Sequence, residues 1–169
     1  FEAPMKDLAK KITTSWLADP VVINAVKKQN EAHAALKQDE IIVLDKKWRS
    51  ETGATDQPMI KAVLANELSK FLVAEKEKSA GLFTEVFVMD NKGLNAGQSD
   101  ITSDYWQGDE AKWQKTFLVG ASAVHLGDVE KDESTQTFQS QLSLPVVDPA
   151  DNTVIGAITL GVNVEMLAQ

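Results

Sequence analysis

The residues best suited to chemistry gather between Asp100 and Trp113. Tyr105, Trp106 and Trp113 lie there among aspartate, glutamate and lysine side chains. Tyrosine and tryptophan combine a flat apolar surface with a polar group, which suits the wall of a pocket for a small polar molecule. Gly108 and the polar flanks indicate a connection between elements rather than a core strand. We therefore predict a small-molecule pocket here; the alternative is that the indoles simply anchor the segment onto the rest of the fold.

Four polar side chains could complete such a pocket. Lys112 and Lys115 could offer positive charge to a ligand carboxylate, although lysines beside aspartate and glutamate are more often solvated. Gln139 and Gln141 alternate with apolar neighbours on a later strand, so both would project from the same face. They would hydrogen-bond a ligand or else meet water. The predicted ligand-binding residues are Tyr105, Trp106, Lys112, Trp113, Lys115, Gln139 and Gln141.

Catalysis and metal binding find little support in the residue types. The sequence has no cysteine, and its two histidines, His33 and His125, lie in unrelated contexts. We therefore predict no enzyme activity, no metal and no cofactor. A small hydrolase that uses Asp104 and Asp109 as paired carboxylates is the remaining catalytic alternative. It would require both side chains to be buried together with raised pKa values.

The charge balance argues against further classes of partner. Seventeen basic and twenty-five acidic residues give a net charge of −8, which disfavours binding to nucleic acid and to anionic membrane surfaces. Arg49 is the only arginine, so a single guanidinium is available for bidentate recognition of carboxylate or phosphate. No apolar run approaches the ~18 residues that a membrane-spanning helix needs.

Hydrophobic periodicity predicts the helices that must support the pocket. Apolar residues at helical spacing predict an amphipathic helix over 4–17, and Asp19-Pro20 is typical of the start of another. Whether these two segments form one kinked helix or two stays open. A further turn or two is expected over 41–48, and a long apolar stripe predicts one helix over 58–80.

From residue 82 the apolar period becomes strand-like. Alternation predicts strands over 82–89, 94–98, 121–129, 137–147 and 153–164. A short helical insert is expected near 109–117. We therefore predict one α+β domain over 1–169, with helices over 1–80 and an antiparallel sheet of about five strands over 82–164.

Five stretches of the sequence together resemble a known family. They are Val86-Phe-Val-Met-Asp-Asn-Lys-Gly93, Ser103-Asp-Tyr-Trp-Gln-Gly-Asp-Glu-Ala-Lys-Trp113, His125-Leu-Gly-Asp-Val129, Gln141-Leu-Ser-Leu-Pro-Val-Val-Asp-Pro149 and Val154-Ile-Gly-Ala-Ile-Thr-Leu-Gly-Val-Asn-Val164. In this order they are similar to the extracytoplasmic PAS-like sensor domains called Cache or PDC domains, of the single-Cache type. The C-terminal pattern Ser-x-Pro-Val-x-Asp followed by Val-Ile-Gly is the most specific part, and the match covers residues 82–164.

The resemblance implies a long N-terminal helix along one face of a five-stranded antiparallel sheet, with the ligand on the opposite face beneath the aromatic connection. It also implies a periplasmic location and a non-catalytic role as the input module of a chemoreceptor, histidine kinase or cyclic-dinucleotide enzyme. Family members bind small carboxylates, amino acids or related metabolites. The predicted ligand-binding residues fall on the family's aromatic pocket segment, near its basic position and on its ligand-facing strand.

One departure bears on the ligand. Lys112-Trp113-Gln114 stands where amino-acid-binding members carry an arginine followed closely by Trp-Tyr, which argues against an amino acid. We expect a small metabolite such as a carboxylate. We also expect membrane attachment through segments that flank this chain, and pairing of two copies through the N-terminal helices. The alternative function is a free-standing periplasmic accessory or interaction protein of the same fold without a ligand.

Overall fold

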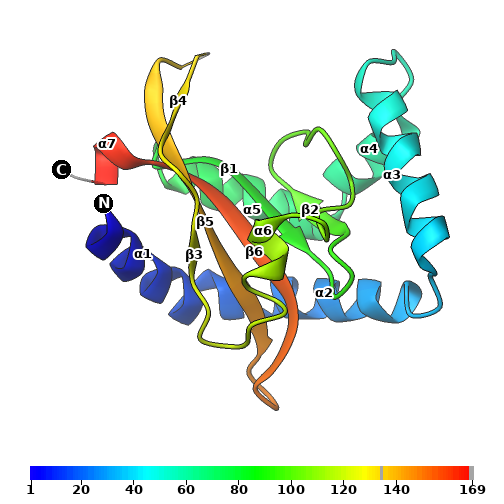
Figure 1. Cartoon of the computed structure of the whole chain (residues 1–169), viewed down its shortest axis with the longest axis horizontal. Coiled ribbons are helices and arrows are strands. Elements are labelled where there is room, and N and C mark those ends of the chain that lie inside the picture. The colour runs from blue at the N-terminus through cyan, green and yellow to red at the C-terminus, as the bar shows by residue number, and fades with distance from the viewer. Residues whose placement is uncertain (134, 168–169) are drawn as a thin grey trace.

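The computed structural model describes residues 1–133 and 135–167 and confirms the predicted α+β architecture (Figure 1). The helical elements are α1 (Glu2–Thr14), η1 (Trp16–Ala18), α2 (Pro20–Ala32), α3 (Gln38–Thr52), α4 (Pro58–Leu64), α5 (Glu67–Lys78), α6 (Ala111–Gln114) and α7 (Val164–Leu167). The strands are β1 (Phe83–Met89), β2 (Asn95–Gln98), β3 (His125–Leu126), β4 (Glu130–Asp132), β5 (Thr137–Asp148) and β6 (Thr153–Asn163). Helices thus precede a sheet, as the change of apolar period indicated.

The sheet is antiparallel and follows the order β2-β1-β6-β5-β3, with β4 also paired to β5. β5 and β6 form its long central hairpin, in which Leu142 pairs with Leu160 and Ser143 with Thr159. β3 and β4 pair with successive parts of β5, so the sheet is five strand positions wide.

One face of the sheet packs against helices. Alternate residues of a strand project to opposite faces, so Val86 and Val88 of β1 point to the same side and share one core cluster with residues of β5 and β6. α1, α2 and α5 cover that side with buried apolar residues, among them Met5, Ile12, Val22, Val26, Leu68 and Leu72. This cluster is the main core of the protein.

The other face is covered by the connection that runs from β2 to β3. Phe87 and Met89 of β1 and Ala157 of β6 pack there against Trp113 of α6 and the neighbouring Phe117. Figure 1 shows α6 in front of the strands, with α5 behind them. The connection rich in acidic and aromatic residues therefore lies on the sheet face opposite the helical layer.

α3 and α4 form a separate support beside the β2 edge of the sheet (Figure 1). They hold a second apolar cluster that contains Ile41, Trp48 and Ile60 together with Leu94 and Tyr105. Because Tyr105 belongs to the aromatic connection, this cluster ties the connection to α3.

The first two helical segments are separate helices, which settles the alternative that the sequence left open. α1 ends at Thr14 and η1 follows, after which the side chain of Asp19 accepts a hydrogen bond of 2.9 Å from the backbone N–H of Val21 at the start of α2. The long N-terminal helix implied by the resemblance is therefore interrupted by the turn at residues 15–19. α3 is also longer than the turn or two expected over 41–48.

The prediction of one helix over 58–80 was wrong. α4 ends at Leu64, and α5 begins after Asn66, whose side chain accepts a hydrogen bond of 2.8 Å from the N–H of Ser69. Asparagine is a strong N-cap residue, so the break has a local cause. The apolar stripe runs through the break because α4 contributes to the second cluster and α5 to the main core.

The strand predicted over 121–129 was also wrong in extent. Only His125–Leu126 forms a strand there, and the short β4, which was not predicted, follows at Glu130–Asp132. Val124 and Val129 are 41% and 46% exposed. Their apolar character suggested burial, but they lie at an edge of the sheet.

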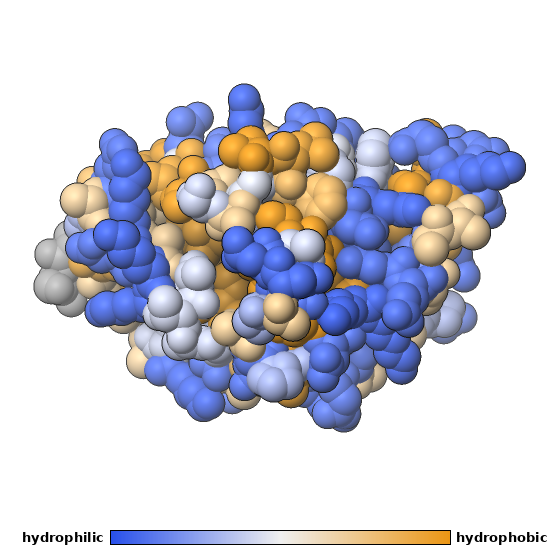
Figure 2. Space-filling view, turned by 90° about the horizontal axis from the view of Figure 1, so that it is seen from below, coloured by the Kyte–Doolittle hydropathy of each residue, from blue (hydrophilic) through white to orange (hydrophobic). Residues whose placement is uncertain are grey.

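The surface agrees with the acidic composition. The view from below in Figure 2 shows hydrophilic residues over much of this face, with hydrophobic residues gathered in patches between them. None of the helices in the described ranges is long and apolar enough to cross a membrane.

Candidate functional site

A polar hollow of about 170 Å³ lies between the sheet and the aromatic connection. Its floor includes Glu85 and Phe87 of β1 and Gln141 of β5. Its walls come from two parts of the connection, residues 101–104 and residues 107–112, and include Ser103, Asp104, Gln107, Glu110 and Lys112. The hollow thus combines three strand residues with a segment that the sequence marked as chemically rich.

The floor depends on a glycine in the middle strand. Glu85 of β1 pairs with Gly161 of β6, which in turn pairs with Gln141 of β5. Gln141 Nε2 donates a hydrogen bond of 3.2 Å to Glu85 Oε1 across this glycine. A Cβ at position 161 would lie 3.1 Å from Cγ of Glu85 and would crowd Oγ1 of Thr84. Glycine therefore lets the two polar side chains meet above the middle strand.

α3 holds the wall in place through a buried carboxylate. Asp45 Oδ1 accepts hydrogen bonds from the backbone N–H groups of Tyr105 (2.9 Å) and Trp106 (3.0 Å). One turn along the helix, Trp48 Nε1 donates to the carbonyl of Thr102 at 2.8 Å, and its ring stacks on Tyr105 with centroids 5.3 Å apart. Hydrogen bonds to a charged acceptor are stronger than neutral ones, so Asp45 is the main fastening of the wall to α3.

A second fastening joins the wall to β2. Asn95 Nδ2 donates to Gln98 Oε1 (3.1 Å) and to Thr102 Oγ1 (2.9 Å), and the Thr102 hydroxyl donates to the carbonyl of Asp104 at 2.7 Å. Asn95 and Gln98 are fully buried. These hydrogen bonds fasten residues 102–104 to β2.

The carboxylates of Asp104 and Glu110 in the wall are partly buried, and burial shifts their pKa values. Burial raises the pKa of Asp104 above its ordinary value, and the nearby Asp45 carboxylate raises it further. Burial likewise raises the pKa of Glu110, an effect that the Lys112 ammonium opposes. Arg49 offsets part of this charge, with Nε 2.9 Å from Asp45 Oδ2 and Nη2 3.8 Å from Asp104 Oδ2.

Two acceptor atoms at the hollow have no hydrogen-bond partner among the described residues, namely Gln107 Oε1 and Glu110 Oε2. Gln107 is only 2% exposed, and its Nε2 donates to Asp104 Oδ1 at 2.8 Å. Lys112 Nζ lies 3.9 Å from Glu110 Oε2 and 5.4 Å from the centroid of the Phe87 ring. A buried acceptor without a donor is costly, so a bound molecule with N–H or O–H groups would be favoured here.

The seven residues that the sequence predicted as ligand-binding lie in different places in the structure. Lys112 and Gln141 line the polar hollow. Trp106 and Trp113 line a second hollow of about 420 Å³ beside Ile41 and Lys92. The two sets therefore do not share one pocket.

The other three predicted residues lie outside both hollows. Tyr105 is buried in the cluster between α3 and β2. Lys115 is exposed to solvent. Gln139 accepts a hydrogen bond of 2.7 Å from the hydroxyl of Thr84. Their part in ligand binding stays a prediction.

The two tryptophans also serve the alternative role of anchors. Trp113 Nε1 donates to the carbonyl of Asp90 at 3.1 Å, and its ring stacks on Phe117 with centroids 5.0 Å apart. Trp106 Nε1 donates to the carbonyl of Lys92 at 2.9 Å. Each indole thus fastens the connection to the turn between β1 and β2.

Sequence reasoning missed most residues of the polar hollow as ligand contacts, among them Glu85, Phe87, Gln107 and Glu110. One signal was available, because Glu85 is the only charged residue in the largely apolar run from 82 to 89. A carboxylate on a strand that is covered on both faces needs a polar partner. The sequence gave no indication that Phe87, Gln107 and Glu110 line a site, since their positions depend on pairings with distant parts of the chain.

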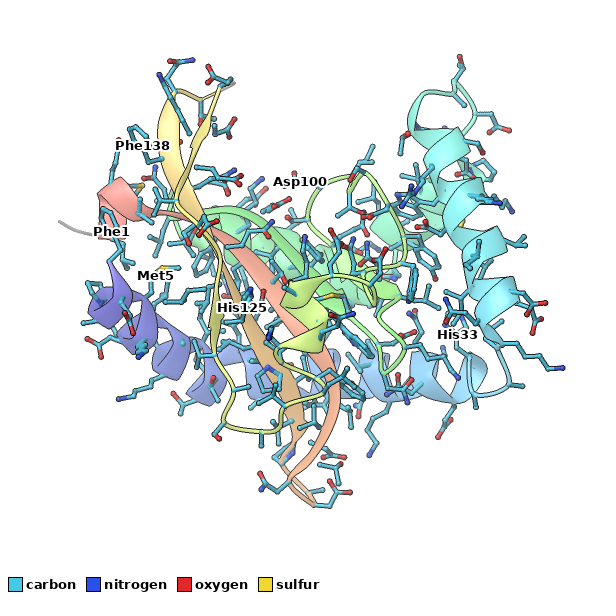
Figure 3. All side chains as sticks on the ribbon, in the orientation of Figure 1. Phe1, Met5, His33, Asp100, His125 and Phe138 are labelled. Atoms are coloured by element: carbon cyan, nitrogen blue, oxygen red, sulfur yellow. The ribbon has the colours of Figure 1, made fainter. Side chains whose placement is uncertain are left out.

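The carboxylate pair considered for hydrolysis is not assembled as that alternative required. Asp109 is exposed, and the carboxylate that acts on Glu110 within the hollow is Asp104. His33 and His125 lie in separate parts of the molecule (Figure 3). Across residues 1–133 and 135–167 no group of three or more metal-binding side chains comes together.

No protein-family model and no curated protein matches the chain. Solved structures do match it. The ligand-binding domain of the Campylobacter jejuni chemoreceptor Tlp3 in complex with 4-methylisoleucine is 12% identical with a TM-score of 0.44, over 93% of this chain and 64% of that one. The ligand-binding domain of the Pseudomonas aeruginosa PAO1 amino acid chemoreceptor PctC in complex with GABA is 16% identical with a TM-score of 0.46, over 90% and 61%.

The sensor domain of the V. cholerae histidine kinase DctB is 12% identical with a TM-score of 0.42, over 98% of this chain and 58% of that one. The chain therefore spans less than two thirds of each of these three structures. All three are sensory or ligand-binding domains, the class of protein that the sequence resembles.

Proposed function

We propose that this chain is a small-molecule-binding sensor domain of the Cache/PDC type, which holds its ligand in the polar hollow between the sheet and residues 101–112. The observation that carries the proposal is the buried side chain of Gln107, a lining residue of the hollow whose Oε1 has no hydrogen-bond donor in the described chain. A ligand that donates to this atom would recover the free energy that its burial costs.

The shape of the site supports a small ligand. Pockets for drug-sized molecules measure roughly 300–1,000 Å³, and this hollow is smaller. Its walls are fixed by Asp45 on one side and by the Asn95 network on the other. A site whose walls are held in this way loses little conformational entropy when a ligand binds.

β1 offers a route for transmission. Glu85 and Phe87 line the hollow, and the residues between and after them, Val86 and Val88, pack into the core beneath the helices. A ligand that binds more tightly to one position of β1 would shift the equilibrium between two packings of the helices. The size of this shift is limited by the difference in the ligand's affinity for the two packings. We propose that the domain lies outside the cytoplasm and reports binding through its helices to attached segments.

Thermal unfolding against a metabolite panel tests the proposal, because a ligand that binds the native state raises the melting temperature. The matched variants are Ser103→Trp, which adds a large ring at a residue that lines the hollow, and Ser50→Trp, which adds the same ring at an exposed position of α3. We expect at least one compound to stabilise the wild type and Ser50→Trp but not Ser103→Trp. Equal stabilisation of all three proteins, or no stabilisation by any compound, would contradict the proposal.

A further inference from the structure

We infer, on the basis of the proposed function, that the hollow binds a small organic cation, such as an amine without a carboxylate, whereas the sequence favoured a carboxylate.

Negative charge dominates the lining of the hollow. Glu85, Asp104 and Glu110 carry carboxylates, and Lys112 is the one cationic side chain among the described lining residues. A ligand carboxylate would add another negative charge at short range in a partly desolvated space, where like charges repel more strongly than in water. An ammonium group would instead reduce the excess of negative charge.

The hydrogen-bonding capacity that remains is also of the acceptor kind. Gln107 Nε2 already donates to Asp104, and Gln141 Nε2 already donates to Glu85. In contrast, Gln107 Oε1 is buried with no donor from the described part of the chain, and Glu110 Oε2 has only the Lys112 ammonium at 3.9 Å, beyond hydrogen-bond distance. A carboxylate has acceptors alone and could satisfy neither atom, whereas an alkylammonium group brings three N–H donors.

The floor already accommodates a cation. Lys112 Nζ lies 5.4 Å from the centroid of the Phe87 ring and 3.9 Å from Glu110 Oε2. An aromatic face within about 6 Å of an ammonium attracts it, more strongly where water is excluded. Phe87 is 2% exposed, so its ring and the adjacent carboxylate form a position suited to a positive charge. In the ligand-free protein Lys112 occupies this position, so it would compete with an amine ligand.

The protonation behaviour of the walls agrees with this assignment. Burial raises the pKa of both Asp104 and Glu110, so the protein holds these negative charges at a cost. A bound cation would lower both pKa values by direct attraction.

Calorimetric titration with matched ligands distinguishes the ligand classes. Ethylamine, butylamine and ethanolamine represent cations, acetate, butyrate and succinate represent anions, and alanine represents zwitterions. We expect the amines to bind and the anions not to. Binding by the anions alone, or by alanine alone, would overturn the inference and leave the proposed function standing. No binding by any class would contradict both.

Substitution of Lys112 should change the affinity for amines and the affinity for anions in opposite directions. Lys112→Met keeps the apolar length of the side chain and removes its charge, so it should strengthen amine binding by several-fold through the loss of a competing cation. If the ligand were an anion, the same change would weaken or abolish binding. Lys115→Met is the matched control, because Lys115 is exposed and lies outside the hollow.

Glu110→Gln tests the carboxylate that faces this position. The variant should weaken amine binding by about tenfold or more, as the loss of a hydrogen bond to a charged group predicts. Glu31→Gln, on the exposed face of α2, should leave binding unchanged. Unfolding curves of all four variants confirm that each folds. Unchanged amine affinity in a folded Glu110→Gln variant would contradict the inference.

Discussion

At the scale of single residues, the site depends on a few buried polar atoms whose partners come from distant parts of the chain. Asp45 of α3 accepts from two backbone N–H groups of the aromatic connection, and Gln107 directs an amide donor to Asp104. Such contacts can be measured one at a time, because each leaves an unpaired group when its partner is removed.

Asp45→Ala should lower the free energy of unfolding by about 2–3 kcal/mol, since it strands the N–H groups of Tyr105 and Trp106. Urea unfolding measures the change. Asp7→Ala, which removes an exposed carboxylate from α1, is the control and should change stability by less than about 0.5 kcal/mol. Equal effects of the two substitutions would show that Asp45 does not fasten the wall.

The half-buried Glu110 should make the free energy of unfolding fall as pH rises. Its pKa is raised in the folded protein, so the folded state binds more protons than the unfolded state between the ordinary and the raised pKa, and stability falls as pH rises through that window. Glu110→Gln lacks this proton and should gain stability relative to the wild type as pH rises. The charged groups around this carboxyl are Asp104, Asp109, Lys112 and Arg49.

Unfolding free energies of the wild type and Glu110→Gln, measured at matched pH values above and below the ordinary glutamate pKa, provide the check. A difference between the two proteins that stays constant with pH would contradict a raised pKa at this position. Glu31→Gln again serves as the control for the loss of one exposed carboxyl.

Substitution of Trp113 distinguishes the two roles that the sequence left open for the indoles, pocket lining and anchoring. It is 9% exposed and packs with Phe87, Met89 and Phe117, so Trp113→Ala should cost about 3–5 kcal/mol of stability. Thermal unfolding of the variant measures this loss. A native melting temperature together with weakened ligand binding would instead identify Trp113 as a ligand contact rather than an anchor.

At the scale of elements, the sequence predicted the type of most helices and strands but not all of their ends. The stripe over 58–80 includes the buried Ile60, Leu68 and Leu72, yet it could not reveal that two helices share it. The local signal was Asn66, a cap residue inside an apolar pattern. The strand over 121–129 failed for a different reason, because residues at a sheet edge need not follow the periodic burial on which such predictions rest.

Asn66 also joins helix to sheet, so its substitution has two separable effects. Its Oδ1 caps α5 at Ser69, and its Nδ2 donates to the carbonyl of Ala96 in β2 at 2.9 Å. Asn66→Ala should cost about 1 kcal/mol for the cap and a similar amount for the lost bond to β2. Asn66→Asp keeps the cap acceptor and should lose only the second part. Equal losses in the two variants, measured by urea unfolding, would contradict a capping role.

At the scale of the whole molecule, the arrangement of helices on one face and the aromatic connection on the other was predictable from the resemblance and the strand alternation. The composition of the hollow was not. Glu85 meets Gln141 only because β1, β6 and β5 pair in one register with glycine in the middle. Asp45 reaches the connection from a helix sixty residues earlier in the chain. Spacing within one sequence does not report such long-range pairings.

The central claim is that a small amine occupies the polar hollow beside Gln107 and Glu85, rather than the larger hollow beside Trp106 and Lys92. Nuclear magnetic resonance tests it most directly, by following backbone amide and glutamine side-chain signals during titration with butylamine. The account predicts saturable shifts centred on Glu85, Gln107 and Glu110, including the side-chain amide of Gln107. Shifts centred on Lys92 and the indole signals of Trp106 and Trp113, or no saturable shift at all, would contradict it.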